Sequence, residues 1–157
     1  MTNLLTYARD FREVVLQGDS SERMCVALSA PLHAAFHAQG IPTQLVVSDL
    51  GECEHIFLQL ADGQVLDPTA DQFNWCSRQK LPGVYLGAPA LIHEGAEPWP
   101  GGQEWHELMT VLKRLYPALN ATVVGRTVSM ALRTLPPGLC EFTPATVLRA
   151  ADGRWPR

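Results

Sequence analysis

The chain has 157 residues, of which 46% are hydrophobic and 18% are charged, and its formal net charge is -4. This length suits one domain that buries enough surface to support a core of its own. The acidic balance argues against a nucleic-acid-binding surface and against a polybasic segment that would attach to membranes.

Charged residues interrupt the apolar residues of 1–17, so the sequence predicts no signal peptide, and no later run is apolar enough for a membrane span. The cysteines show no C-x-x-C spacing, which favours reduced thiols in a reducing compartment. They are Cys25, Cys53, Cys76 and Cys140. We therefore expect a cytoplasmic protein, and delivery to another cell would leave no trace in such a sequence.

Apolar residues at helical spacing predict a first helix over 4–16, which residues 18–21 (Gly-Asp-Ser-Ser) should end. We expect a second helix to begin near Ser21, with Ser20 or Ser21 as its N-cap and Cys25 in its first or second turn. Unpaired backbone amides and the positive end of the helix dipole favour a thiolate at such a position.

Pro31 predicts a kink or a break in this second helix, because a proline inside a helix removes a hydrogen bond. The helical face continues beyond it to Gly40, a plausible C-cap. Residues 43–48 alternate and are rich enough in β-branched side chains to predict a strand.

Residues 54–60 alternate between two faces, as a half-buried strand requires, and residues 61–63 (Ala-Asp-Gly) indicate a turn. If Gly63 takes the left-handed position of a three-residue loop, Leu60 pairs with Gln64. His55 then lies diagonal to Asp67 on the same face of the hairpin. A four-residue loop would send Asp67 to the opposite face, so this contact depends on the register.

The second half of the chain is less regular. Residues 78–102 contain four prolines and five glycines, which predicts a loop-rich segment or lid rather than a long element. Residues 103–116 predict an amphipathic helix, residues 123–135 fit a helix or a strand, and the tail has little periodicity. We expect one domain over 1–157, with a catalytic core at 20–73 and a helical and irregular extension at 103–157.

A cysteine at a helix start, a histidine on a following strand and an aspartate on the next strand form a possible Cys-His-Asp triad. In it, Cys25 is the nucleophile, His55 is the base that later protonates a leaving group, and Asp67 orients the imidazole. The backbone amide of Cys25 is one oxyanion donor, and the spacing identifies no second one.

Three segments in this order resemble the transglutaminase-like superfamily of papain-fold cysteine enzymes. They are 24–28 (Met-Cys-Val-Ala-Leu), 40–47 (Gly-Ile-Pro-Thr-Gln-Leu-Val-Val), and 54–58 (Glu-His-Ile-Phe-Leu) followed by 66–69 (Leu-Asp-Pro-Thr). The resemblance covers about a third of the chain and implies the same roles for Cys25, His55 and Asp67. The sequence departs from the family pattern at Thr43-Gln44, at Ile56-Phe57 and at Pro31.

The predicted fold is therefore α+β and papain-like or transglutaminase-like, with the nucleophile-bearing helix packed on an antiparallel sheet. The expected reaction is acyl transfer from an amide through a thioester, by a peptidase, amidase or glutamine deamidase if water is the acceptor. A transglutaminase or other acyltransferase, and a non-catalytic binding module, stay open as alternatives. Expected partners are a protein or peptide substrate or a small amide, with no nucleic acid, membrane or cofactor.

Structural roles for each residue, and metal binding, are the competing interpretations. Cys25 alone would be a core cysteine, His55 alone a structural histidine, and Asp67 before Pro68 a turn residue. His33 and His37 have helical i, i+4 spacing but no acidic partner of an H-E-x-x-H motif. A set of Cys53, His55 and Cys76 lacks paired spacing, so we expect no metal site.

Overall fold

The computed structural model describes residues 3–16, 18–38 and 40–100. Two α-helices, α1 (Leu4–Leu16) and α2 (Cys25–Ala38), precede the sheet. The strands are β1 (Thr43–Asp49), β2 (Glu54–Leu60), β3 (Val65–Asp67), β4 (Tyr85–Gly87) and β5 (Glu97–Pro98). Two short 3-10 helices, η1 (Ala70–Phe73) and η2 (Leu91–His93), lie in the connections.

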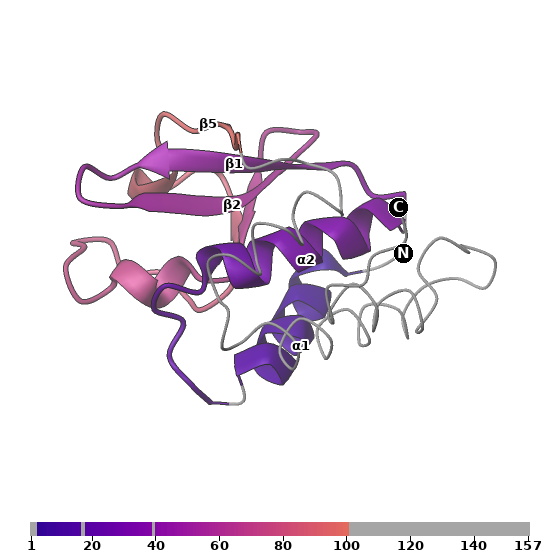
Figure 1. Cartoon of the computed structure of the whole chain (residues 1–157), viewed down its shortest axis with the longest axis horizontal. Coiled ribbons are helices and arrows are strands. Elements are labelled where there is room, and N and C mark those ends of the chain that lie inside the picture. The colour runs from indigo at the N-terminus through magenta and orange to yellow at the C-terminus, as the bar shows by residue number, and fades with distance from the viewer. Residues whose placement is uncertain (1–2, 17, 39, 101–157) are drawn as a thin grey trace.

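The five strands form one antiparallel sheet in the order β4-β3-β2-β1-β5. Helix α2 packs on β1 and β2, and α1 packs against α2 on the side away from the sheet (Figure 1). The fold is therefore α+β with the helix that begins at Cys25 packed on an antiparallel sheet, as predicted.

Helix α2 is buried around most of its circumference because the sheet covers one side and α1 another. Phe11 of α1 and Phe36 of α2 are almost fully buried in this layer, each stabilising the fold by roughly 1.5–3 kcal/mol. Ser29 of α2 donates to the backbone oxygen of Ile56 over 3.2 Å, which fixes the helix on β2.

The expected start of α2 was wrong. The helix begins at Cys25 rather than near Ser21, and the Ser21 hydroxyl donates to Asp71 over 2.7 Å instead of capping the helix. The helix continues through Pro31, so the expected break is absent, and the alternative of a kink stays a prediction. The lost hydrogen bond is tolerated in a segment whose neighbouring side chains are all buried. Gly40, with φ of 72°, follows the helix end as expected.

The β2–β3 hairpin has the register that a three-residue loop requires. Leu58 pairs with Leu66, the Leu60 amide donates to the Gln64 oxygen over 2.8 Å, and Gly63 has φ of 86°. Strand β2 is more buried than the alternation predicted, since 55–58 are buried on both faces. The segment that follows β3 returns over the second face, where Phe57 forms a small core with Val46, Val65, Tyr85 and Ala96.

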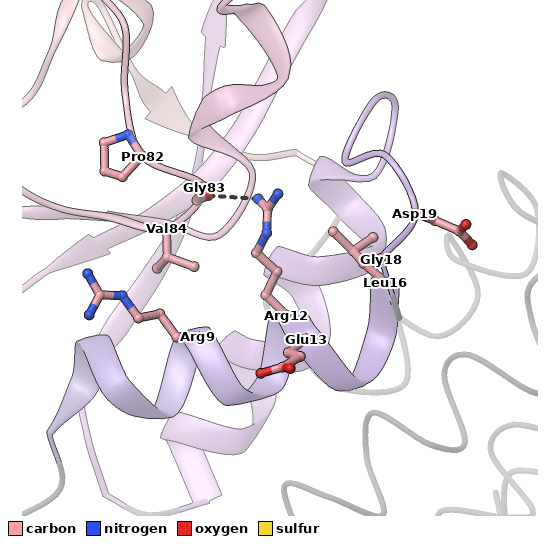
Figure 2. Close-up of a pocket in the computed structure, with 9 residues that line it drawn as sticks. All are labelled: Arg9, Arg12, Glu13, Leu16, Gly18, Asp19, Pro82, Gly83 and Val84. Atoms are coloured by element: carbon pink, nitrogen blue, oxygen red, sulfur yellow. Dashed lines mark hydrogen bonds between the residues drawn. The ribbon is translucent and has the colours of Figure 1, made fainter.

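Arg12 joins α1 to the segment that follows β3. Its guanidinium donates to both carboxylate oxygens of Asp71, over 2.9 and 2.8 Å, and to the backbone oxygens of Pro68 and Gly83, each over 2.8 Å. Figure 2 shows the side chain reaching from α1 to Gly83. Both residues line a hollow of about 430 Å³. These contacts hold residues 68–71, directly after Asp67, against the helical layer.

Residues 78–100 contain only short elements, in agreement with the loop-rich prediction for 78–102 as far as residue 100. The helix predicted over 103–116, the ambiguous segment 123–135 and the rest of the extension lie outside the described residues. The assignment of 1–157 to one domain stays a prediction. Among the residues that the structure describes, no helix is both long and apolar enough to cross a membrane.

Candidate functional site

Cys25 is the first residue of α2, and its side chain is 8% exposed. Met24 precedes the helix and accepts the Leu28 amide over 2.9 Å, so the backbone N–H groups of the first turn lie at this end of α2. The thiol lies close enough to His55 to help raise the pKa of its imidazole. The structure thus brings together the cysteine and the histidine that the sequence singled out.

His55 lies on β2 and is fully buried. Its Nε2 atom lies 2.6 Å from Oδ2 of Asp67, which leaves Nδ1 as the nitrogen available to the Cys25 thiol. Burial by itself lowers the pKa of His55, but the charge and hydrogen bond of Asp67, with a smaller contribution from Cys25, raise it to about 9. The pair therefore favours a protonated imidazole.

Asp67 ends β3 and is also fully buried. Burial raises the pKa of this carboxyl, whereas the charge of His55 and the hydrogen bonds from His55 and His93 lower it more strongly, to well below its usual range. The group is therefore a buried carboxylate, which persists because its oxygens are hydrogen-bonded. The contact between His55 and Asp67 follows from the hairpin register.

His93 completes a buried His-Asp-His cluster and was not among the predicted site residues. Its Nε2 lies 2.9 Å from the same Oδ2 atom of Asp67 that contacts His55. Its Nδ1 accepts the Ala90 amide over 3.0 Å, so the ring proton of a neutral His93 lies on Nε2 and is donated to Asp67. Ser48 fixes this loop by donating to the Ile92 oxygen over 2.6 Å.

The geometry of the cluster bears on whether it holds a metal ion. One ligand atom from each of His55, Asp67 and His93 lies within 4.8 Å of the others. A metal would need the lone pair of each Nε2, and the Nδ1 of a metal-bound histidine normally donates a proton to an acceptor. In His93 the reverse holds, because Nδ1 accepts from Ala90. The donor set fits a hydrogen-bonded cluster better than a metal site.

The structure does not bring together the side chains of the two other possible metal sites. His33 is buried and its Nδ1 lies 2.7 Å from Thr43 Oγ1, whereas His37 is exposed. Cys53 and Cys76 are exposed, and His55 is directed to Asp67 instead. Cys25, Cys53 and Cys76 are free thiols, and Cys140 lies outside the described residues.

Gln72, on η1, connects the two ends of the site. Its Nε2 donates to Thr69 Oγ1 over 2.9 Å and lies 3.1 Å from Nδ1 of His55. Thr69 Oγ1 in turn donates to Oδ1 of Asp67 over 3.3 Å. His55, Asp67, Thr69 and Gln72 therefore form a closed ring of hydrogen bonds.

A cleft of about 420 Å³ lies beside this ring. Gln72 lines it together with four large apolar side chains, Leu50, Phe73, Trp75 and Ile92. Trp75 is 83% exposed, and the Phe73 ring lies nearly perpendicular to the His55 ring at a centroid distance of 5.0 Å. The side chains that contact the imidazole thus continue into an open surface cleft.

Gln72 and His93 could not be found from sequence spacing. Gln72 follows Asp67 by five residues, on an element too short for a periodic signal. His93 lies in a loop-rich run that gave no element to place it on. Comparison of the chain with protein-family models, with curated proteins and with solved structures finds no match.

Proposed function

We propose that this chain is a cysteine-dependent acyl-transfer enzyme that acts on an amide bond through a thioester at Cys25. The proposal rests chiefly on one arrangement: a thiol at a helix start acts on the pKa of an imidazole that contacts a buried carboxylate through Nε2. A cysteine nucleophile with an oriented base requires these three groups in this order.

Each residue has a defined part in the reaction. His55 Nδ1 takes the thiol proton, and the sulfur of Cys25 attacks the amide carbon while the carbonyl π electrons move to oxygen. The C–N bond then breaks, and the same Nδ1 proton passes to the leaving amine, which gives the thioester. Asp67 keeps Nε2 of His55 directed at its carboxylate and stabilises the imidazolium.

The acceptor decides the class of enzyme. Water, activated by His55, converts the thioester into an acid and a free thiol, as in a peptidase, amidase or glutamine deamidase. An amine in place of water would make the enzyme a transglutaminase or another acyltransferase. Hydrolysis is the proposed outcome, because water is always present. The order of the three residues along the chain supports a likeness to the transglutaminase-like superfamily.

The proposed substrate is a protein, a peptide or a small amide that enters the cleft beside Gln72. The apolar side chains of Phe73, Trp75 and Ile92 suit an apolar group on the acyl side of the bond. The alternative is a binding module that keeps this fold without catalysis.

Alkylation of Cys25 tests the proposal. We expect iodoacetamide to modify Cys25 as a thiolate well below pH 8.5, and faster than the exposed thiols of Cys53 and Cys76. The rate for each cysteine is followed against pH by mass spectrometry. His55→Ala should remove the faster reaction of Cys25. His37→Ala, which changes an exposed histidine on the helix that carries Cys25, should preserve it.

A Cys25 that reacts no faster than an ordinary or buried thiol in the wild type would contradict catalysis. The binding module would then be the better explanation, and a search for a partner would replace substrate screening.

A further inference from the structure

We propose that Gln72 is the second oxyanion donor of this site, and that the N–H group directed toward His55 Nδ1 donates to the substrate carbonyl once that nitrogen is protonated. The inference rests on the proposed function. It supplies the donor that the sequence did not identify, from the 3-10 helix after Asp67 rather than from the residues around Cys25.

The orientation of the Gln72 amide follows from its neighbours. Thr69 uses its hydroxyl proton on Oδ1 of Asp67, so its oxygen accepts from Gln72. The amide nitrogen therefore occupies this end of the side chain. One N–H is directed to Thr69 over 2.9 Å, and the second is directed to His55 Nδ1, 3.1 Å away.

This second N–H is bound in only one protonation state of His55. It needs the lone pair of Nδ1, and the same lone pair must accept the proton of Cys25 when the thiol attacks. In the protonated imidazole that the site favours, Nδ1 carries a proton, so the Gln72 N–H has no acceptor at His55. It is then available to the carbonyl oxygen of the substrate, which gains negative charge when the thiolate attacks.

The location of Gln72 suits the role of an oxyanion donor. The side chain touches the base on one side and lines the 420 Å³ cleft on the other, so a carbonyl in the cleft can reach its N–H. The bond to Thr69 holds the amide in place while its other N–H donates to the carbonyl. The oxyanion then accepts from Gln72 Nε2 and from the Cys25 backbone amide, and it returns its electrons to carbon when the C–N bond breaks.

Two reactions of the Cys25 thiol distinguish an oxyanion donor from a residue that only positions His55. Alkylation by iodoacetamide is a displacement at carbon that needs the thiolate but no oxyanion donor. Acetylation by 4-nitrophenyl acetate passes through an oxyanion. A residue that only positions His55 should affect both reactions alike, whereas an oxyanion donor should affect acetylation far more.

The test measures both rates at Cys25 by mass spectrometry in the full chain. Gln72→Met removes both N–H donors at similar length, Gln72→Glu keeps the shape but offers no N–H, and Gln44→Met changes an exposed glutamine on β1 as a control. We expect acetylation to fall about 100-fold in both Gln72 variants. Alkylation should change by less than about 10-fold, as for one lost neutral hydrogen bond.

Equal loss of both rates in the two Gln72 variants would overturn the proposal and leave the proposed function standing, with Gln72 as a residue that only positions His55. Unchanged acetylation in both variants would also overturn it. A wild-type Cys25 that is neither acetylated nor alkylated as a thiolate would overturn the proposed function, and this inference with it.

Discussion

Thr69 donates both its backbone N–H and its hydroxyl to Oδ1 of Asp67, over 2.9 and 3.3 Å. The other oxygen, Oδ2, is therefore left to His55 and His93. Four donors on one carboxylate explain how a fully buried aspartate stays ionised, since each hydrogen bond to the charged form stabilises that form. Asp67 is thus the centre of the cluster, and the two histidines depend on it.

Replacing this carboxylate should disable the nucleophile. In Asp67→Asn the negative charge that raises the pKa of His55 is absent, so the imidazole is a weaker base toward Cys25. We expect acetylation of Cys25 by 4-nitrophenyl acetate at neutral pH to fall about 100-fold or more. Asp62→Asn is the matched control, because Asp62 is exposed on the same hairpin and accepts hydrogen bonds from the nearby Gln64. Equal rates in the two variants would contradict the role of Asp67.

His93 should stabilise the fold through the N–H group that it donates to Asp67. His93→Phe keeps an aromatic ring beside Phe57 and Tyr85 but leaves Asp67 with one donor fewer. We expect the free energy of unfolding to fall by about 1–3 kcal/mol and the pKa of Asp67 to rise. Denaturant titration measures the first effect, and the pH at which acid begins to destabilise the fold measures the second.

His93→Gln restores an N–H donor and is the control for this prediction. It should recover part of the lost stability and most of the tolerance to acid. If His93→Phe and His93→Gln behave alike, the ring of His93 contributes packing only.

Stability should also depend on pH through His55. Its pKa rises from 6.5 to about 9 on folding, so its contribution to stability is fully present below pH 6.5 and is lost as the pH rises through about 9. Denaturant titrations across this range should show a decline in the wild type that is absent in His55→Phe. Cys25 makes a smaller contribution to the raised pKa, so Cys25→Ala serves as the second reference and should keep most of the decline.

The local parts of the site were predictable from sequence, and the parts that depend on tertiary contacts were not. The hairpin that joins His55 to Asp67 follows from side-chain alternation and from Gly63, both of which are local properties. The start of α2 was misplaced because Ser21 bonds to Asp71, fifty residues away. His93 reaches Asp67 from a loop that Ser48 holds at Ile92, and no spacing rule expresses such a contact.

Arg12 should stabilise the segment that follows Asp67, through contacts with Pro68, Asp71 and Gly83. Its guanidinium bonds to Asp71 and to the oxygens of Pro68 and Gly83, and the pKa of Asp71 is lowered because these and other hydrogen bonds outweigh the effect of burial. Arg12→Ala removes the whole set, so we expect the free energy of unfolding to fall by about 2–4 kcal/mol. Arg9→Ala, on an exposed face of the same helix, should change the free energy of unfolding by less than about 0.5 kcal/mol.

Arg12→Lys should behave almost like Arg12→Ala, because an ammonium cannot form the paired contact with both oxygens of Asp71. A lysine variant as stable as the wild type would mean that charge alone, rather than the geometry of the guanidinium, holds the segment after Asp67 in place.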